Sequence, residues 1–196
     1  MNKLTIDDIK AKKTSDTIFV LGSGYSVNRV KEEEWDIIKK HNSIAFNWFC
    51  KHPFEPTYFL IREQANLPSR VARGETVDDL VKLTNKYKDT VGIISDVRKH
   101  TKTSYKYAHD SRMELPCLVV MDDNSKRFKK IKNMRCDPTK VGLIHGTCTI
   151  YNVMHLALFL EYKKIVFVGI DLYDSRYFWL KKNKTRHTLK NRKKKF

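Results

Sequence analysis

A short apolar run that continues into a glycine-rich turn stands close to the start of the chain. Thr17–Leu21 is apolar and rich in β-formers, and it leads directly into Gly22-Ser23-Gly24-Tyr25-Ser26. An apolar run that ends at a turn signal is typical of a buried parallel strand. Residues 27–40 carry apolar side chains at intervals that predict an amphipathic helix. A strand, a glycine turn and a helix in this order predict a nucleotide-binding α/β unit, with a phosphate at the N-terminus of the helix.

Apolar runs alternate with helical segments along much of the remaining sequence. We expect further strands at residues 43–49, 57–61, 90–94 and 164–171. Helices are expected at residues 5–12, 76–86 and 150–160. Strands separated by helices predict a Rossmann-like α/β fold, with a doubly wound, mainly parallel sheet and helices on both faces.

The sequence predicts one domain over residues 1–180 and a basic tail over 181–196. Within the domain, 96–138 is polar and charged, and we interpret it as an insertion or a lid. Its apolar patch at 115–121 is a further candidate strand.

The chain is strongly basic, with a net charge of +17. Nine basic residues and no acidic one lie in 181–196. Such charge favours phosphorylated ligands, nucleic acid or an anionic membrane surface. Nucleic acid has less support, because no aromatic side chains are interleaved with these cations. We expect either a tail that holds the protein on the anionic inner membrane, at about 1 kcal/mol per well-placed cation, or a truncated C-terminal end.

The sequence lacks a membrane-spanning run, an apolar leader and closely spaced cysteines. No apolar run approaches the roughly 20 residues of a membrane-spanning helix, and the first residues form no apolar leader, which predicts a cytoplasmic protein. The four cysteines, at positions 50, 117, 136 and 148, are widely spaced. This spacing predicts reduced, mostly packing thiols rather than a zinc site, and it leaves the oligomeric state open.

The glycine turn does not match either common nucleotide fingerprint. A dinucleotide site requires a third glycine where Val27 stands, and an acid at the end of the second strand where Asn47 stands. A P-loop requires a lysine and a hydroxyl residue directly after the turn, and neither is present. The sequence therefore argues against hydride chemistry with a dinucleotide and against a P-loop NTPase.

Polar side chains follow several of the expected strands, where a parallel sheet gathers them at one edge. The candidates are Ser26, Asn47, Thr147, Thr149, Asp171 and Tyr173. Each residue alone also fits an ordinary helix cap or turn. Taken together, these amide and hydroxyl groups suit a nucleoside monophosphate or a nucleotide-sugar held without a metal ion.

Four segments resemble one enzyme family. They are Gly22-Ser23-Gly24-Tyr25-Ser26, Phe46-Asn47, the loop at 145–149 with its apolar helix, and Tyr162-Lys163-Lys164-Ile165 followed by Gly169-Ile170-Asp171-Leu172-Tyr173. This pattern resembles the bacterial lipooligosaccharide sialyltransferases, glycosyltransferase family 42. It is similar, more loosely, to the related glycosyltransferase-like group DUF115, which includes an archaeal pterin diphosphokinase. The resemblance covers roughly 17–177, with the middle third poorly matched.

The resemblance implies a metal-independent transferase of lipopolysaccharide biosynthesis with a CMP-sugar donor, a glycan acceptor and no cofactor. It implies that Ser23, Gly24, Ser26 and Asn47 bind the ribose and phosphate of the donor, CMP-sialic acid or a related sugar. Gly22 and Asp171 are further candidates for substrate binding. Thr147 and Thr149 would contact the donor sugar. Tyr173 and Tyr177 would donate hydrogen bonds to the departing phosphate, and His187 would be the general base.

Two alternatives of other classes remain open. A magnesium-dependent diphosphokinase-like enzyme would need acids such as Asp122, Asp123 and Asp171 to converge, although Asp122-Asp123 also fits a solvated turn. A truncated, non-catalytic module that binds nucleotides or nucleic acid is the second alternative, and the basic residues of 181–196 favour it.

Overall fold

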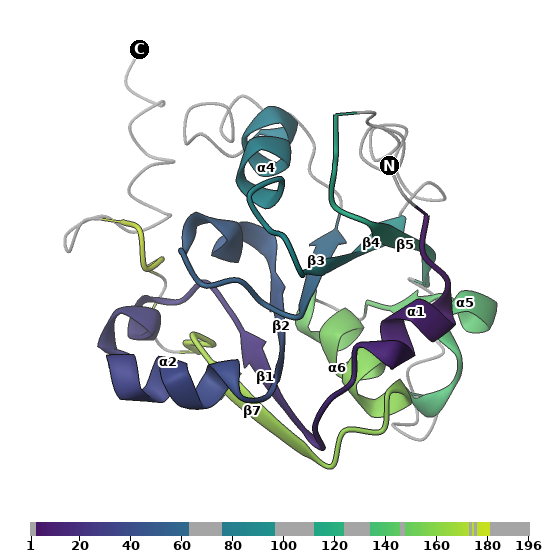
Figure 1. Cartoon of the computed structure of the whole chain (residues 1–196), viewed down its shortest axis with the longest axis horizontal. Coiled ribbons are helices and arrows are strands. Elements are labelled where there is room, and N and C mark those ends of the chain that lie inside the picture. The colour runs from purple at the N-terminus through teal and green to yellow at the C-terminus, as the bar shows by residue number, and fades with distance from the viewer. Residues whose placement is uncertain are drawn as a thin grey trace.

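A computed structural model describes residues 3–62, 76–96, 112–123, 134–145, 148–172, 174 and 176–180 (Figure 1). Seven strands form one sheet in the order β6-β5-β4-β3-β2-β1-β7, and every neighbouring pair is parallel. The strands are β1 (Thr17–Leu21), β2 (Asn42–Phe46), β3 (Tyr58–Arg62), β4 (Val91–Asp96), β5 (Cys117–Asp123), β6 (Leu143–Ile144) and β7 (Lys164–Val168). The predicted parallel sheet is confirmed.

Helices cover both faces of this sheet (Figure 1). They are α1 (Ile6–Ala11), α2 (Glu32–Lys39), α4 (Val77–Thr84), α5 (Pro138–Val141) and α6 (Ile150–Phe159), with 3₁₀ helices η1 (Tyr25–Arg29) and η2 (Asn47–Lys51). Helices α2 and α4 pack on one face, and α1 and α6 on the other. The usual right-handed crossover is consistent with opposite faces for α2 and α4 and for α6, because the chain advances from β1 to β4 in one direction and returns from β6 to β7 in the other. The Rossmann-like, doubly wound architecture is therefore also confirmed.

The central strands are buried on both faces, which is why they read as continuous apolar runs. In β3, Tyr58 and Leu60 pack into the cluster beneath α1 and α6, whereas Phe59 and Ile61 pack into the cluster beneath α2 and α4. All four side chains are at most 2% exposed. The alternation follows from the two-residue period of a strand.

The strand order reverses at β1, which pairs with β2 on one side and β7 on the other. The register joins Thr17 to Lys164 and Leu21 to Val168, so β1 and β7 end at the same level. In open α/β sheets, ligands bind in the crevice outside the carboxyl ends of the strands at such a reversal. The fold thus predicts a ligand site beside the glycine turn.

The sequence predicts a helix over 27–40, and the predicted start of this helix is wrong. The glycine turn leads instead into η1, and Val30 and Lys31 are extended before α2 begins at Glu32. The N–H of Lys31 donates to the Glu34 carboxylate at 2.8 Å, and three acidic residues in the first turn suit the helix dipole. Helix α2 therefore begins after Lys31 and not at the glycine turn.

The range 96–138, interpreted as an insertion or a lid, contains a strand of the sheet. Strand β5 pairs with β4, with Gly92 opposite Cys117, and with β6. Residues 97–111 and 124–133 lie outside the described residues, as does the predicted tail at 181–196. In the part of the chain that the structure describes, no helix is long and apolar enough to cross a membrane.

A buried asparagine fastens the segment after α1 to the start of β2. Asn42 is 2% exposed. Its side-chain oxygen accepts the N–H groups of Thr14 at 2.8 Å and Ser15 at 3.0 Å, and its amide donates to the Lys12 carbonyl at 2.8 Å. One side chain thus satisfies three backbone groups next to the sheet.

We expect Asn42→Ala to lower the free energy of unfolding by about 2–4 kcal/mol, because it leaves these backbone groups without a partner in a buried site. Urea denaturation followed by circular dichroism measures the change. Asn28→Ala is the matched control, since its amide makes one exposed bond, to the Phe178 carbonyl. Equal losses in the two variants would contradict the role given to Asn42.

Candidate functional site

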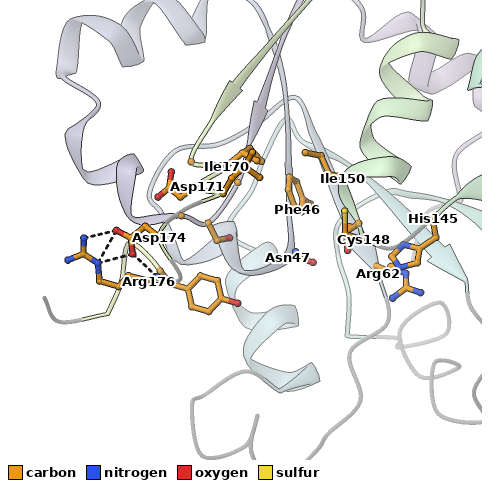
Figure 2. Close-up of a pocket in the computed structure, with 17 residues that line it drawn as sticks. Phe46, Asn47, Arg62, His145, Cys148, Ile150, Ile170, Asp171, Asp174 and Arg176 are labelled. Carbon is orange, nitrogen blue, oxygen red and sulfur yellow. Dashed lines mark hydrogen bonds and ion pairs between the residues drawn. The ribbon is translucent and has the colours of Figure 1, made fainter. Parts of the chain in front are cut away.

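A pocket of about 620 Å³ opens at the carboxyl edge of the sheet, beside the β1–β7 reversal (Figure 2). Its walls come from the turn after β1, the ends of β2, β3 and β6, the start of α6 and the segment after β7. This volume is within the usual range for small-molecule sites. The ligand site expected from the strand order is therefore a real cavity.

Most of the predicted site residues that the structure describes line this pocket. They are Gly22, Ser23, Gly24, Asn47, Thr149, Asp171 and Tyr177. Ser26 does not line the pocket, but its N–H donates to the carboxylate of Asp171, which does. Tyr173, Thr147 and His187 lie outside the described residues.

The glycines after β1 allow the turn to lie directly against the end of β7. The N–H groups of Gly22 and Gly24 donate to the carbonyls of Val168 and Gly169, both at 2.8 Å. A Cβ on Gly22 would collide with the Gly169 carbonyl, and one on Gly24 would lie 2.6 Å from an Asp171 carboxylate oxygen. The close approach expected of these glycines is thus made to the protein's own backbone and carboxylate.

Asp171 occupies the N-terminus of η1, the helix that follows the glycine turn. Its carboxylate accepts the Ser26 N–H at 2.8 Å and also the Ser26 hydroxyl. An acidic group at a helix N-terminus satisfies free N–H groups, as a phosphate would. Ser26 and Asp171 are both predicted site residues, and the structure brings them together as partners of each other.

Two predicted residues are suited to contact a ligand directly. The Ser23 hydroxyl oxygen is buried and has no hydrogen-bond partner in the described structure. A buried hydroxyl without a partner is costly, and an ordered water is the usual partner of such a group. Asn47 follows β2 immediately, as predicted, and its left-handed φ of 56° is one that asparagine tolerates better than most residues.

The segment after β7 returns to the glycine turn and forms one end of the pocket. Tyr177 forms an antiparallel bridge with Gly24, and the Phe178 N–H donates to the Ser23 carbonyl at 3.2 Å. The Phe178 ring packs edge-on against Phe49, with centroids 6.1 Å apart. These contacts fix the backbone of Tyr177 at the pocket, although no local sequence signal predicts the docking.

An ion pair that sequence reasoning missed lies at the same end of the pocket. The Arg176 side chain donates three bonds to Asp174: from Nε to the two carboxylate oxygens at 2.9 and 3.0 Å, and from Nη2 at 2.6 Å (Figure 2). Its guanidinium also lies over the Tyr25 ring, 3.9 Å from the centroid. Hydrogen bonds from the Arg176 side chain and backbone lower the pKa of Asp174 to about 2. The pair is therefore ionised at neutral pH.

The opposite end of the pocket is built on two buried polar residues of α6. Asn152 donates to the Ile144 carbonyl at 3.0 Å, and its oxygen lies 3.0 Å from Nδ1 of His145. His155 accepts the Ile144 N–H at 3.2 Å, and its Nε2 lies 2.9 Å from the Cys136 carbonyl oxygen. Both α6 residues are fully buried. Asn152 and His155 are polar residues in an otherwise apolar helix, and this pattern is the sequence signal that could have identified the network.

Arg62, at the end of β3, is a second cationic residue of the pocket that the sequence analysis missed. In Figure 2 it lies with His145 and Cys148 at the end away from Asp174 and Arg176. Its position directly after an expected strand could have identified it. The pocket thus has an arginine at each end, and Arg176 is paired with Asp174.

The acids proposed for a magnesium site do not converge. Asp122 and Asp123 were expected in a turn, but they are the last residues of β5. Five strand spacings of about 4.8 Å, or about 24 Å, separate β5 from β7, where Asp171 follows. Oxygen ligands of Mg²⁺ lie about 2.1 Å from the ion, so these three acids cannot share one. Among the described residues, no group of three or more His, Cys, Asp or Glu is placed to hold a metal ion.

The cysteines divide into two kinds, and all four are free thiols. Cys50 and Cys117 are buried packing residues, and burial raises the pKa of each to about 12. Cys136 and Cys148 are exposed, so the expectation of packing thiols holds for only two of the four. Cys148 is in the pocket wall.

No protein-family model matches this chain, and no curated protein matches it significantly. The function is therefore inferred from the residues of the pocket and their chemistry.

The Asp174–Arg176 pair predicts a measurable titration. Because the folded-state pKa lies below the ordinary value of about 3.9, the pair stabilises the fold above about pH 4 and loses this contribution as the pH falls toward 2. We expect NMR to show Asp174 still ionised at pH 3 in the wild type, and half protonated near pH 4 in Arg176→Gln. An unchanged Asp174 titration in the variant would contradict the assigned cause.

Proposed function

We propose that this protein is a metal-independent glycosyltransferase that uses a nucleotide-sugar donor, CMP-sialic acid or a related sugar, to modify a cell-surface glycan. The observation that carries the proposal is one cavity of about 620 Å³ at the β1–β7 reversal, lined by Ser23, Asn47, Thr149 and Tyr177. The resemblance described above implies that Ser23, Asn47 and Thr149 bind the donor and that Tyr177 bonds to the departing phosphate.

The composition of the wall supports a nucleotide-sugar more than a redox cofactor. The turn lacks a third glycine, and Asn47 stands where a dinucleotide site needs an acid. The unsatisfied hydroxyl of Ser23 and the side chain of Asn47 can bond to ribose and phosphate oxygens. Asp171 already holds Ser26, so in this proposal it shapes the nucleotide site and does not bind phosphate.

Arg176 and Tyr177 are placed to stabilise the leaving group. Both line the pocket at the end formed by the segment after β7. In the proposed reaction the acceptor oxygen forms a bond to the anomeric carbon, and CMP departs with the electron pair of the broken bond. A guanidinium and a phenol that are already in place stabilise the charge that develops on this phosphate. Tyr173 would assist, and His187 would accept the acceptor's proton, by the resemblance alone.

The proposal includes an acceptor and a place in the cell. The acceptor would be a lipopolysaccharide glycan, and the reaction would take place at the cytoplasmic side of the inner membrane. The nine cations of 181–196 would attract the protein to anionic lipids there.

We expect purified protein to release CMP from CMP-sialic acid without added metal, and CMP to raise its melting temperature. Arg176→Gln should slow CMP release about 100-fold, as expected for the loss of one charge-stabilising donor. Arg112→Gln is the matched control, because Arg112 is also paired with an aspartate, Asp78 at 2.7 Å, but is not part of the pocket. Its rate should stay within about twofold of the wild type.

Other outcomes select among the alternatives. Absence of both CMP release and a CMP-induced shift would show the proposal to be wrong. A strict Mg²⁺ requirement with transfer of diphosphate would favour the diphosphokinase-like class. Salt-sensitive retention of RNA without any nucleotide-induced shift would favour a non-catalytic nucleic-acid-binding module.

A further inference from the structure

The hydrogen bonds of Asn152 fix which nitrogen of His145 carries the proton. The amide nitrogen of Asn152 donates to the Ile144 carbonyl, which can only accept, so the side-chain oxygen must be the atom that faces His145. An oxygen acceptor 3.0 Å from Nδ1 requires a proton on Nδ1. In the neutral imidazole, Nε2 is then unprotonated and available as a proton acceptor.

The orientation is held firmly, because Asn152 is fully buried. Turning the amide by 180° would place its oxygen against the Ile144 carbonyl oxygen, so that two acceptors would face each other. Asn152 is itself held by α6, whose His155 bonds to the next backbone group of β6. The geometry is thus set by the core and not by the exposed surface.

His145 differs from the other described histidines in what its second nitrogen does. Both ring nitrogens of His155 are engaged with backbone groups, at 3.2 and 2.9 Å, which is a structural role. Of the four described histidines (His41, His52, His145 and His155), His145 alone lines the pocket, and no partner for its Nε2 occurs among the described residues. Its unprotonated nitrogen is therefore available to a ligand.

The position of His145 suits an inverting displacement. Figure 2 shows His145 at one end of the pocket and Asp174 and Arg176 at the other, with Phe46 and Asn47 between them. An inverting reaction needs the base and the leaving group on opposite sides of the reacting carbon. Arg176 and Tyr177 at the leaving-group end and His145 at the far end satisfy this requirement.

We infer that His145 is the general base of the proposed transfer, and that Asn152 is the positioning residue that keeps its Nε2 unprotonated. This inference rests on the proposed function and replaces His187 as the base. The acceptor oxygen bonds to the anomeric carbon, its proton moves to Nε2 of His145, and CMP leaves with the electron pair. Nε2 then returns the proton to solvent, so no metal ion or co-reactant is consumed.

The experiment compares His145→Gln with His187→Gln in the full chain, with CMP-sialic acid as donor and water as acceptor. We expect His145→Gln to slow CMP release about 100- to 10,000-fold, the range for loss of a general base. The CMP-induced shift in melting temperature should be unchanged, and the acid limb of the pH–rate profile should disappear. His41→Gln is the matched control, because His41 is not part of the pocket, and it should keep the wild-type rate. A loss of rate in His187→Gln with a wild-type rate in His145→Gln would overturn the inference.

A measurement on the wild-type protein tests the tautomer without any variant. The ¹⁵N NMR signals of His145 should show a protonated Nδ1 and an unprotonated Nε2 at neutral pH. A proton on Nε2 would overturn the inference. So would a His145→Gln variant with the wild-type rate and pH profile, and in that case the proposed function would stand. Absence of CMP release from the wild type would overturn both.

Discussion

The pocket depends on the close contact between the turn after β1 and the end of β7. Backbone bonds of 2.8 Å from Gly22 and Gly24 continue the β1–β7 ladder past the last strand residues. The Asp171 carboxylate then closes the contact by bonding to Ser26 at the start of η1. No side chain larger than hydrogen fits at either glycine without displacing this arrangement. The composition of the turn thus serves first to join two strands whose paired residues are 147 positions apart in the sequence.

The other walls follow from how neighbouring strands end. Asn47 and Arg62 follow or complete β2 and β3 at the same edge, because parallel strands place their carboxyl ends together. At the far side, Asn152 and His155 fasten β6 to α6 from within the core. Polar groups of the pocket are therefore supported by buried groups, which is the condition for a binding or catalytic geometry to be maintained.

Much of the fold could be predicted from the sequence, because the strands are buried on both faces and appear as apolar runs. Thr17–Leu21 and the runs that became β3 and β4 lie within two residues of their predicted places, and β7 begins at the predicted residue. Local reasoning failed where a capping interaction decided the outcome, as at Lys31 and Glu34, which delay the start of α2. It failed for Asp122 and Asp123 because turn-like composition there was overridden by pairing of β5 with β6.

The site was predictable in part. Strand-end reasoning identified Ser26, Asn47 and Asp171, and the resemblance added Ser23. Neither showed that Asp171 bonds to Ser26, because the two are distant in sequence. The Asp174–Arg176 pair and the orientation of His145 depend on tertiary contacts that no spacing pattern specifies. Sequence patterns located the edge of the sheet where the chemistry lies, and the packed structure supplied the partners of each group.

The most direct test of this account is a crystal structure of the protein grown with CMP. We predict the nucleotide in the pocket beside the β1–β7 reversal, with a ribose or phosphate oxygen bonded to the Ser23 hydroxyl and the phosphate toward Arg176. CMP bound elsewhere, or a pocket that stays empty at saturating CMP, would contradict the account.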